Sequence, residues 1–187
     1  LLETATCATD FYELEGTGVS ASLRETYELA RKRANGLIYF AADDYLHEER
    51  AVLEIVKTYQ RLTISHKCEV ALFPCDYPDL YKHIYPTVVT LGSHRHWRAT
   101  DDTTGADVIS IETLKDHWNT YMRFSEYGSD PHVTEQNTIS TIYRDHVPSF
   151  APLPSLSVHL QHFDTLSPYF DWEKWWALSK LEALSKS

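Results

Sequence analysis

The run Leu37-Ile-Tyr-Phe-Ala-Ala42 is the feature that most restricts how this chain can fold. It follows the helix-stop pair Asn35-Gly36 and ends abruptly at Asp43-Asp44. A continuous apolar run of this length, bounded by a turn signal and by charges, is typical of a strand that is buried on both faces. We therefore expect a central strand in an α/β protein whose helices cover both sides of a sheet.

Amphipathic patterns surround this strand. We expect a helix over 22–34, capped by Ser20 or Ser22, then a second helix over 48–62 and a short buried strand over 70–73. Strand, helix and strand in this order indicate a parallel unit, and so a mostly parallel sheet.

The rest of the chain continues the α/β pattern, and we expect a single domain over 1–187. We predict loops and irregular strands over 74–104, and an extended connection over 148–154. The remaining expected elements are a strand over 107–111, helices over 111–124 and 135–144, a strand over 155–159 and a C-terminal helix over 172–185.

Charge and cysteine content narrow the function classes. The net charge is −10 without any Lys/Arg-rich block, which argues against nucleic acid or an anionic membrane as the main partner. No apolar run is long enough to span a bilayer. The three cysteines, Cys7, Cys68 and Cys75, form no regular spacing, so we expect reduced thiols and a cytoplasmic protein.

The carboxylate pair Asp43-Asp44 is the first candidate site. In open α/β sheets, ligands bind beyond the carboxyl ends of the strands. Adjacent carboxylates repel each other, and Mg²⁺ or Mn²⁺ bridging to substrate phosphates would relieve that repulsion. A solvated pair at a helix N-terminus explains the local pattern as well, and the two interpretations remain open at this point.

Four ordered motifs resemble the inverting-type family 2 glycosyltransferases of GT-A fold. The strand and its flank resemble a bacterial and phage branch with a Glu-Asp-Asp-Tyr-Leu-His-like motif. The motifs, spread over roughly 15–175, are Gly36–His47 with the preceding Gly16–Ser22 segment, His96–Thr100 followed by Thr103-Thr104, Pro152–His159, and Leu166–Pro168 with Asp171–Glu173. The resemblance implies a three-layer GT-A sandwich and a nucleoside-diphosphate sugar, UDP- or GDP-linked, as donor.

The resemblance also implies roles for particular residues. Asp44 would ligate Mn²⁺ or Mg²⁺, and Asp43 would contact the ribose or the metal. A histidine near the end of such domains often completes the metal site, and His159 matches that position, with His162 as the nearby competitor. Family members place the catalytic base at the start of a helix after the acceptor-binding segment, where this chain has Glu135.

Other candidates follow from side-chain chemistry. Asp130, just upstream of Glu135, is the alternative base, and Arg98 could bind a phosphate through its guanidinium fork. His96 and Trp97 could contact the acceptor, although a loop packed on the sheet is an equal alternative.

Gly18 and Ser20 precede an expected helix start, where backbone N–H groups could approach the donor phosphate or base. Helix capping or a surface location would explain each of the acidic and histidine candidates without chemistry.

Two departures from the family pattern limit this hypothesis. Ala42 stands where relatives of this branch have Glu or Asp, so the Asp-x-Asp spacing is lost. The segment before Gly16 is too short for the strand and helix that normally build the base pocket, so we expect a domain without its N-terminal βα unit.

Three functions therefore remain in competition. The first is metal-dependent transfer of a sugar to a hydroxyl acceptor, a glycan or a small molecule, with inversion implied by the resemblance. The second is a catalytically degenerate module that binds sugar nucleotides or glycans. The third is a phage-type glycosyltransferase acting on modified DNA bases, against which the net charge of −10 argues.

Overall fold

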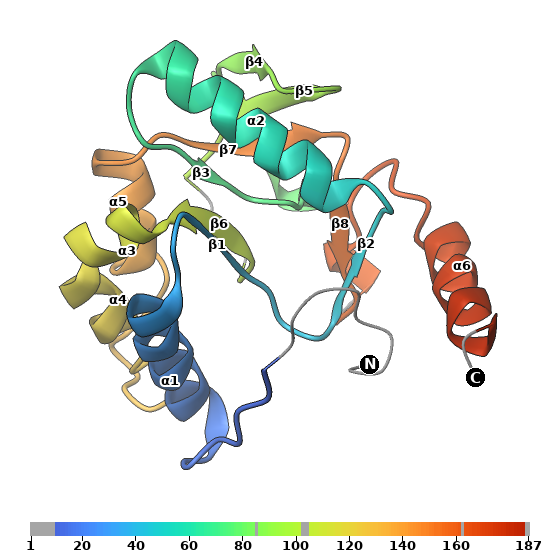
Figure 1. The fold of residues 1–187 in the computed structure, drawn as a ribbon. Helices are drawn as coiled ribbons and strands as arrows, with labels where there is room; N and C mark the ends of the chain where they lie inside the picture. The colour runs from blue at the N-terminus through green and yellow to red at the C-terminus, as the bar shows by residue number, and fades with distance from the viewer. Residues whose placement is uncertain (1–9, 85, 102–104, 162, 186–187) are drawn as a thin grey trace.

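A computed structural model describes residues 10–84, 86–101, 105–161 and 163–185 (Figure 1). Its centre is a six-stranded sheet with the order β1-β6-β3-β7-β5-β4, and a separate two-stranded sheet pairs β2 with β8. The strands of the main sheet are β1 (Leu37–Phe40), β3 (Ala71–Leu72), β4 (Val89–Leu91), β5 (His96–Ala99), β6 (Asp107–Ser110) and β7 (Ser149–Leu153). The small sheet consists of β2 (Tyr45–His47) and β8 (Ser157–His159).

The α/β class is confirmed, but the expectation of a mostly parallel sheet is wrong. Only β3 and β7 pair in parallel, and the other pairings of the main sheet are antiparallel. Because β1 and β3 both pair antiparallel with β6, they run in the same direction, as a strand–helix–strand unit requires. The later strand β6 inserts between them, and the apolar pattern of β1 contains no signal for that insertion.

The position of β1 also differs from the prediction. Its apolar run indicated a central strand, yet β1 lies at one edge of the order that the described strands form. It pairs along its whole length with β6, from Leu37 opposite Ser110 to Phe40 opposite Asp107. At its start Gly36 adopts φ +93°, a left-handed conformation that glycine takes without strain, and its carbonyl accepts a hydrogen bond from Ile111 N–H.

The helices mostly follow the predicted ranges. They are α1 (Gly18–Arg33), α2 (Ala51–His66), α3 (Ile111–Asp116), α4 (Trp118–Phe124), α5 (Ile139–Asp145) and α6 (Trp172–Ser185). The predicted helix over 111–124 is divided at His117, and α5 begins four residues after Glu135. The expected serine caps of the first helix are absent, because α1 already begins at Gly18 with Thr17 as its N-cap.

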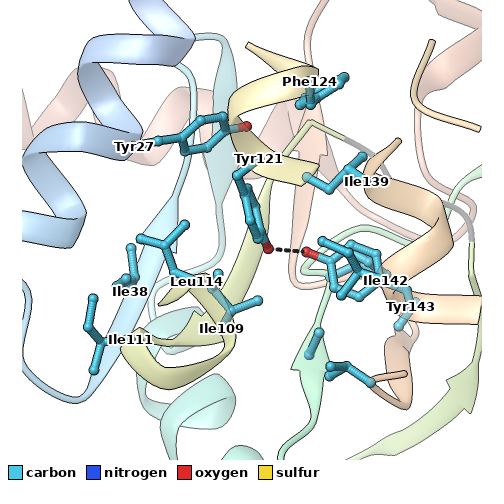
Figure 2. Packing of buried hydrophobic residues seen from close by; sticks show 14 of the residues in the cluster. Tyr27, Ile38, Ile109, Ile111, Leu114, Tyr121, Phe124, Ile139, Ile142 and Tyr143 are labelled. Carbon is cyan, nitrogen blue, oxygen red and sulfur yellow. Dashed lines mark hydrogen bonds between the residues drawn. The ribbon is translucent and has the colours of Figure 1, made fainter. Parts of the chain in front are cut away.

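Helices cover the sheet on two sides, with α2 on one side and α1, α3, α4 and α5 on the other (Figure 1). Alternate side chains of each strand enter opposite cores, as strand geometry requires. Ile38 and Ile109 pack with the four-helix side, as Figure 2 shows, and Phe73 belongs to the same cluster. Val108 and Leu72 pack with α2 instead.

The region predicted to be irregular contains regular strands. β4 and β5 form an antiparallel hairpin within 74–104, and β7 occupies the expected extended connection. Pro152 and Pro154 in that segment favour a non-strand interpretation of the sequence. Within the described residues, no helix is long and apolar enough to cross a membrane.

Candidate functional site

The small sheet brings Asp44 and His159 together. β1 ends at Phe40, a turn through Asp43 and Asp44 follows, and β2 then pairs antiparallel with β8, so that Tyr45 lies opposite His159. Leu160 N–H donates to the Asp44 carbonyl at 2.9 Å, which extends the pairing by one residue. The imidazole Nε2 of His159 lies 2.8 Å from Oδ2 of Asp44, although 115 positions separate the two residues in the chain.

The two oxygens of the Asp44 carboxylate differ: Oδ2 contacts His159, and Oδ1 has no such contact among the described residues. Its Oδ1 is buried and has no hydrogen-bond partner among the residues that the structure describes. The imidazole of His159 is held from the other side by the Tyr45 ring, which stacks on it with centroids 4.6 Å apart and planes 5° from parallel. A fixed imidazole beside a partly unsatisfied carboxylate is an arrangement that can accept a further ligand.

These two side chains fit part of a divalent metal site. Carboxylate oxygen and imidazole nitrogen are both accepted ligands of Mn²⁺, and Mg²⁺ commonly takes one or two carboxylates together with substrate phosphates. No cluster of three or more His, Cys, Asp or Glu side chains able to hold a metal occurs within 10–84, 86–101, 105–161 and 163–185. Asp44 and His159 could therefore hold a metal only together with oxygen ligands from water or from substrate phosphates.

A cavity of about 270 Å³ opens on the four-helix side of the sheet, at the end of β1. It is lined by α1, by Ala42, by the start of β6 and by the α4–α5 region. Glu135, the predicted base, lines it, and so does Asp107 at the first position of β6. We refer to this cavity as the acidic pocket, because Asp107 and Glu135 are the charged groups among its described lining residues.

Asp107 is a buried carboxyl within a tyrosine network. The Tyr143 hydroxyl donates to its Oδ2 at 2.7 Å, and the Tyr121 hydroxyl lies 3.0 Å from that of Tyr143 (Figure 2). Burial raises the pKa of Asp107 to about 6, against the hydrogen bond from Tyr143, which lowers it, and the Glu135 carboxylate raises it further. The pocket therefore holds two interacting carboxyl groups with different environments.

Tyr45 connects the metal candidate with the acidic pocket. Its ring stacks on His159. Its hydroxyl lies close to Gly105, which lines the pocket: a Cβ atom added to Gly105 would be 3.4 Å from that hydroxyl. Burial raises the pKa of Tyr45, and the charges of Asp44 and Glu135 add to this effect. One side chain thus experiences both acidic groups, so the two places belong to the same region of the molecule.

The residues predicted to bind the acceptor and the phosphate, His96, Trp97 and Arg98, do not line the acidic pocket. Trp97 has no exposed surface and packs in the core beneath α2, so its ring is not available to stack on a sugar. Arg98 is also buried, where it forms an ion pair with Asp76 and lies over the Tyr81 ring. These two expectations are replaced by structural roles, and only His96 of the group is exposed.

The remaining candidates divide into two groups. Asp43 is exposed in the turn next to Asp44, and Gly18 begins α1 beside pocket-lining Val19. Ser20 donates instead to the Tyr127 carbonyl at 2.7 Å, which ties α1 to the segment after α4.

Asp130 is paired with other groups outside the pocket lining. It accepts from His132 N–H and from Arg123, and these interactions hold its pKa below the usual range. A lowered pKa makes Asp130 a weaker proton acceptor than a carboxylate of ordinary pKa. The competitor His162 lies outside the described residues.

Asp107 is the residue that the sequence interpretation missed as a site candidate. A signal was present, because Asp107, Ile109 and Ile111 alternate and must share one face of the strand. A carboxylate in register with two core isoleucines is a buried charge, and buried charges need a partner or a function.

No protein-family model, curated protein or solved structure matches this chain.

Proposed function

We propose that this chain is a metal-dependent glycosyltransferase that moves a sugar from a nucleoside-diphosphate donor to a hydroxyl acceptor. The observation that carries the proposal is the 2.8 Å approach of His159 Nε2 to Asp44 Oδ2. The family resemblance pairs these two residues as metal ligands, and nothing in their local sequence requires them to meet. The Oδ1 of Asp44, which is buried and has no hydrogen-bond partner in the described part of the chain, supports a ligand at the same place.

The donor diphosphate belongs on the Asp44 side in this proposal. Asp44 and His159 would hold Mn²⁺ or Mg²⁺ together with phosphate oxygens of a UDP- or GDP-sugar. Bound there, the cation would offset the negative charge that develops on the leaving diphosphate. Asp43, exposed in the same turn, would contact the ribose.

Glu135 would act as the base. As the acceptor oxygen forms its bond to C1 of the sugar, the bond between C1 and the diphosphate oxygen breaks, and the hydroxyl proton passes to Glu135 and then to solvent. Attack from the side opposite the leaving group inverts the configuration at C1. The location of Glu135 in a pocket next to the Tyr45–His159 stack supports this assignment.

A second candidate is a module of the same fold that binds a sugar nucleotide or a glycan without turnover. Ala42 favours it, because this residue lines the acidic pocket and stands where the family that the chain resembles carries an acid. Sugar transfer that disappears in Asp44→Ala would rule this candidate out.

Thermal unfolding with Mn²⁺ and a panel of UDP- and GDP-sugars tests donor binding. A donor at 100 times its dissociation constant should stabilise the protein by about 2.7 kcal/mol. Asp44→Ala should abolish this stabilisation, whereas Glu49→Ala, which removes an equal charge from an exposed position nearby, should retain it. If no donor raises the melting temperature of the wild-type protein, the proposal is wrong.

Turnover is tested separately with Glu135→Gln. This variant should bind the donor as the wild type does, because Glu135 lies outside the proposed metal ligands. Its transfer rate should fall by about 10²–10⁴-fold, the usual contribution of a general base. Undiminished transfer by Glu135→Gln would remove Glu135 from the mechanism while leaving the metal site intact.

A further inference from the structure

The acidic pocket has an unusual charge balance. Two carboxyl groups, Asp107 and Glu135, line it together with aromatic rings, among them Tyr27, Phe40 and Tyr143. No Lys, Arg or His belongs to the described lining residues of this cavity. A phosphate or carboxylate ligand would therefore meet two like charges and no described cation there, which makes the pocket a poor site for the diphosphate of a donor.

Asp107 is positioned by the fold rather than by chance. Its backbone pairs with Phe40 at the end of β1, and the residue is only 8% exposed. Tyr143 donates to one carboxylate oxygen, and Tyr121 in turn lies at hydrogen-bond distance from Tyr143 (Figure 2). Two aligned hydroxyl groups thus fix the direction in which the carboxyl group faces.

We propose that the acidic pocket binds the protonated amine of the acceptor, with the ammonium group against Asp107 and an acceptor hydroxyl against Glu135. The acceptor class is therefore a small amino alcohol in the form of an amino sugar. The word acceptor rests on the glycosyltransferase proposed above, but the amine site itself does not.

An ammonium group complements this pocket better than a neutral hydroxyl does. A carboxylate removed from water regains its lost solvation most fully from an opposite charge, and the faces of aromatic rings attract cations as well. With a pKa of about 6, Asp107 remains mostly ionised at neutral pH, so the required charge is present. A cavity of about 270 Å³ lies just below the range of drug-sized pockets and suits a single sugar ring.

Calorimetric titration with three matched sugars tests the proposal. Glucosamine, glucose and N-acetylglucosamine differ only in carrying an amine, a hydroxyl or a neutral amide at one position. Near neutral pH, without metal or donor, we expect glucosamine to bind at least about ten-fold more tightly than the other two, because only it carries the ammonium group. Equal binding of glucose would overturn the proposal, and so would undetectable binding of glucosamine.

Two variants locate the interaction. Asp107→Asn keeps an acceptor for Tyr143 and should weaken glucosamine binding at least about ten-fold, while folding is verified by circular dichroism. Glu135→Gln, at a more exposed position, should weaken binding to a smaller degree and does not depend on how the core tolerates substitution. Unchanged glucosamine affinity in both variants would contradict the assignment.

The outcome is independent of the donor experiment. Failure of the sugar titration leaves the Asp44 and Mn²⁺ measurements untouched, and would redirect the search to other acceptors. Conversely, glucosamine binding that persists in Asp44→Ala, together with no response to any donor, would leave an amine-binding protein without glycosyl transfer.

Discussion

Two carboxylates in this protein each meet an imidazole, and they differ in how completely they are satisfied. Glu54 on α2 lies 3.0 Å from Nδ1 of His94, and Asp44 lies 2.8 Å from Nε2 of His159. The Glu54 carboxylate also accepts from the backbone N–H groups of Ser93 and His94 and from the side chains of Thr58 and Trp97. Asp44 has one oxygen buried without a partner among the described residues.

The difference separates a structural carboxylate from a candidate binding carboxylate. Glu54 holds the turn of the β4–β5 hairpin onto α2. Burial raises the pKa of Glu54, but its hydrogen bonds outweigh burial, so the pKa is lowered. A metal at Glu54 would have to displace hydrogen bonds, because each of its two oxygens already accepts from a partner. A carboxylate with spare capacity beside a fixed imidazole has something left to bind with.

The largest expected effect concerns Glu54. Glu54→Ala leaves several buried donors without an acceptor, and should lower the free energy of unfolding by about 3 kcal/mol or more. Urea unfolding measures this loss. Gln60→Ala, exposed on the same helix, should change it by less than about 0.5 kcal/mol. Similar small effects at both positions would show that Glu54 does not organise the hairpin.

The next effect sharpens the contrast through pH. The Asp107 pKa rises from 3.8 to about 6 on folding, so the folded state keeps this proton longer and stability falls as pH rises through that window. Asp107→Asn should therefore become more stable relative to wild type by about 2–3 kcal/mol between about pH 4 and pH 7. Urea unfolding across this range tests it, and a pH-independent difference would contradict a buried, ionising Asp107.

Glu54 should behave in the opposite way. Because its pKa is lowered, its contribution is fully present above the unfolded value of 4.5 and is lost as pH falls through the folded value.

Replacing each of the two histidines by alanine tests the difference between the two sites directly. His159→Ala should reduce Mn²⁺ affinity at least about ten-fold, because it removes one of two protein ligands, at a stability cost of about 1 kcal/mol or less. His94→Ala should leave Mn²⁺ binding unchanged while costing about 1 kcal/mol of stability, since this side chain is 70% exposed. Titration of free Mn²⁺ by electron paramagnetic resonance gives both affinities. Equal losses of Mn²⁺ affinity in the two variants would show that the His159 site is not the metal site.

The smallest effect concerns the Tyr45 ring, which stacks on His159. Tyr45→Leu removes the stack that orients His159, and should weaken Mn²⁺ binding by up to about ten-fold. Tyr45→Phe keeps the stacking ring and serves as the matched control, with unchanged Mn²⁺ affinity. Equal behaviour of the two variants would mean that the imidazole is oriented by the β2–β8 pairing alone.

Elements with strong periodicity were predictable from the sequence. α2 and β6 lie close to their predicted ranges, because each contains a clear apolar pattern, and α6 matches its predicted range although its apolar residues do not gather on one face. The proximity of Asp44 and His159 came from the motif resemblance, since no local pattern relates residues 115 positions apart.

Other features lay beyond local patterns. Trp97 and Arg98 have the chemistry of a ligand site, but Trp97 is buried beneath α2 and Arg98 meets Asp76 in the interior. A sequence does not distinguish an aromatic ring that fills a core from one that stacks on a ligand, because both have the same composition. The partner that neutralises Arg98, Asp76, lies in the segment after β3, far from β5 in the sequence, and only folding brings the two together.

The sequence by itself determined where helices such as α2 and strands such as β6 lie in the chain, because those positions depend on the residues of one segment. The direction of the strands, the edge position of β1 and the insertion of β6 were decided by tertiary structure, since a strand buried on both faces has the same apolar pattern in either direction. The same holds for chemistry: the sequence supplied Asp44, His159, Asp107 and Glu135. Their satisfaction or lack of it depends on neighbours that other parts of the chain provide.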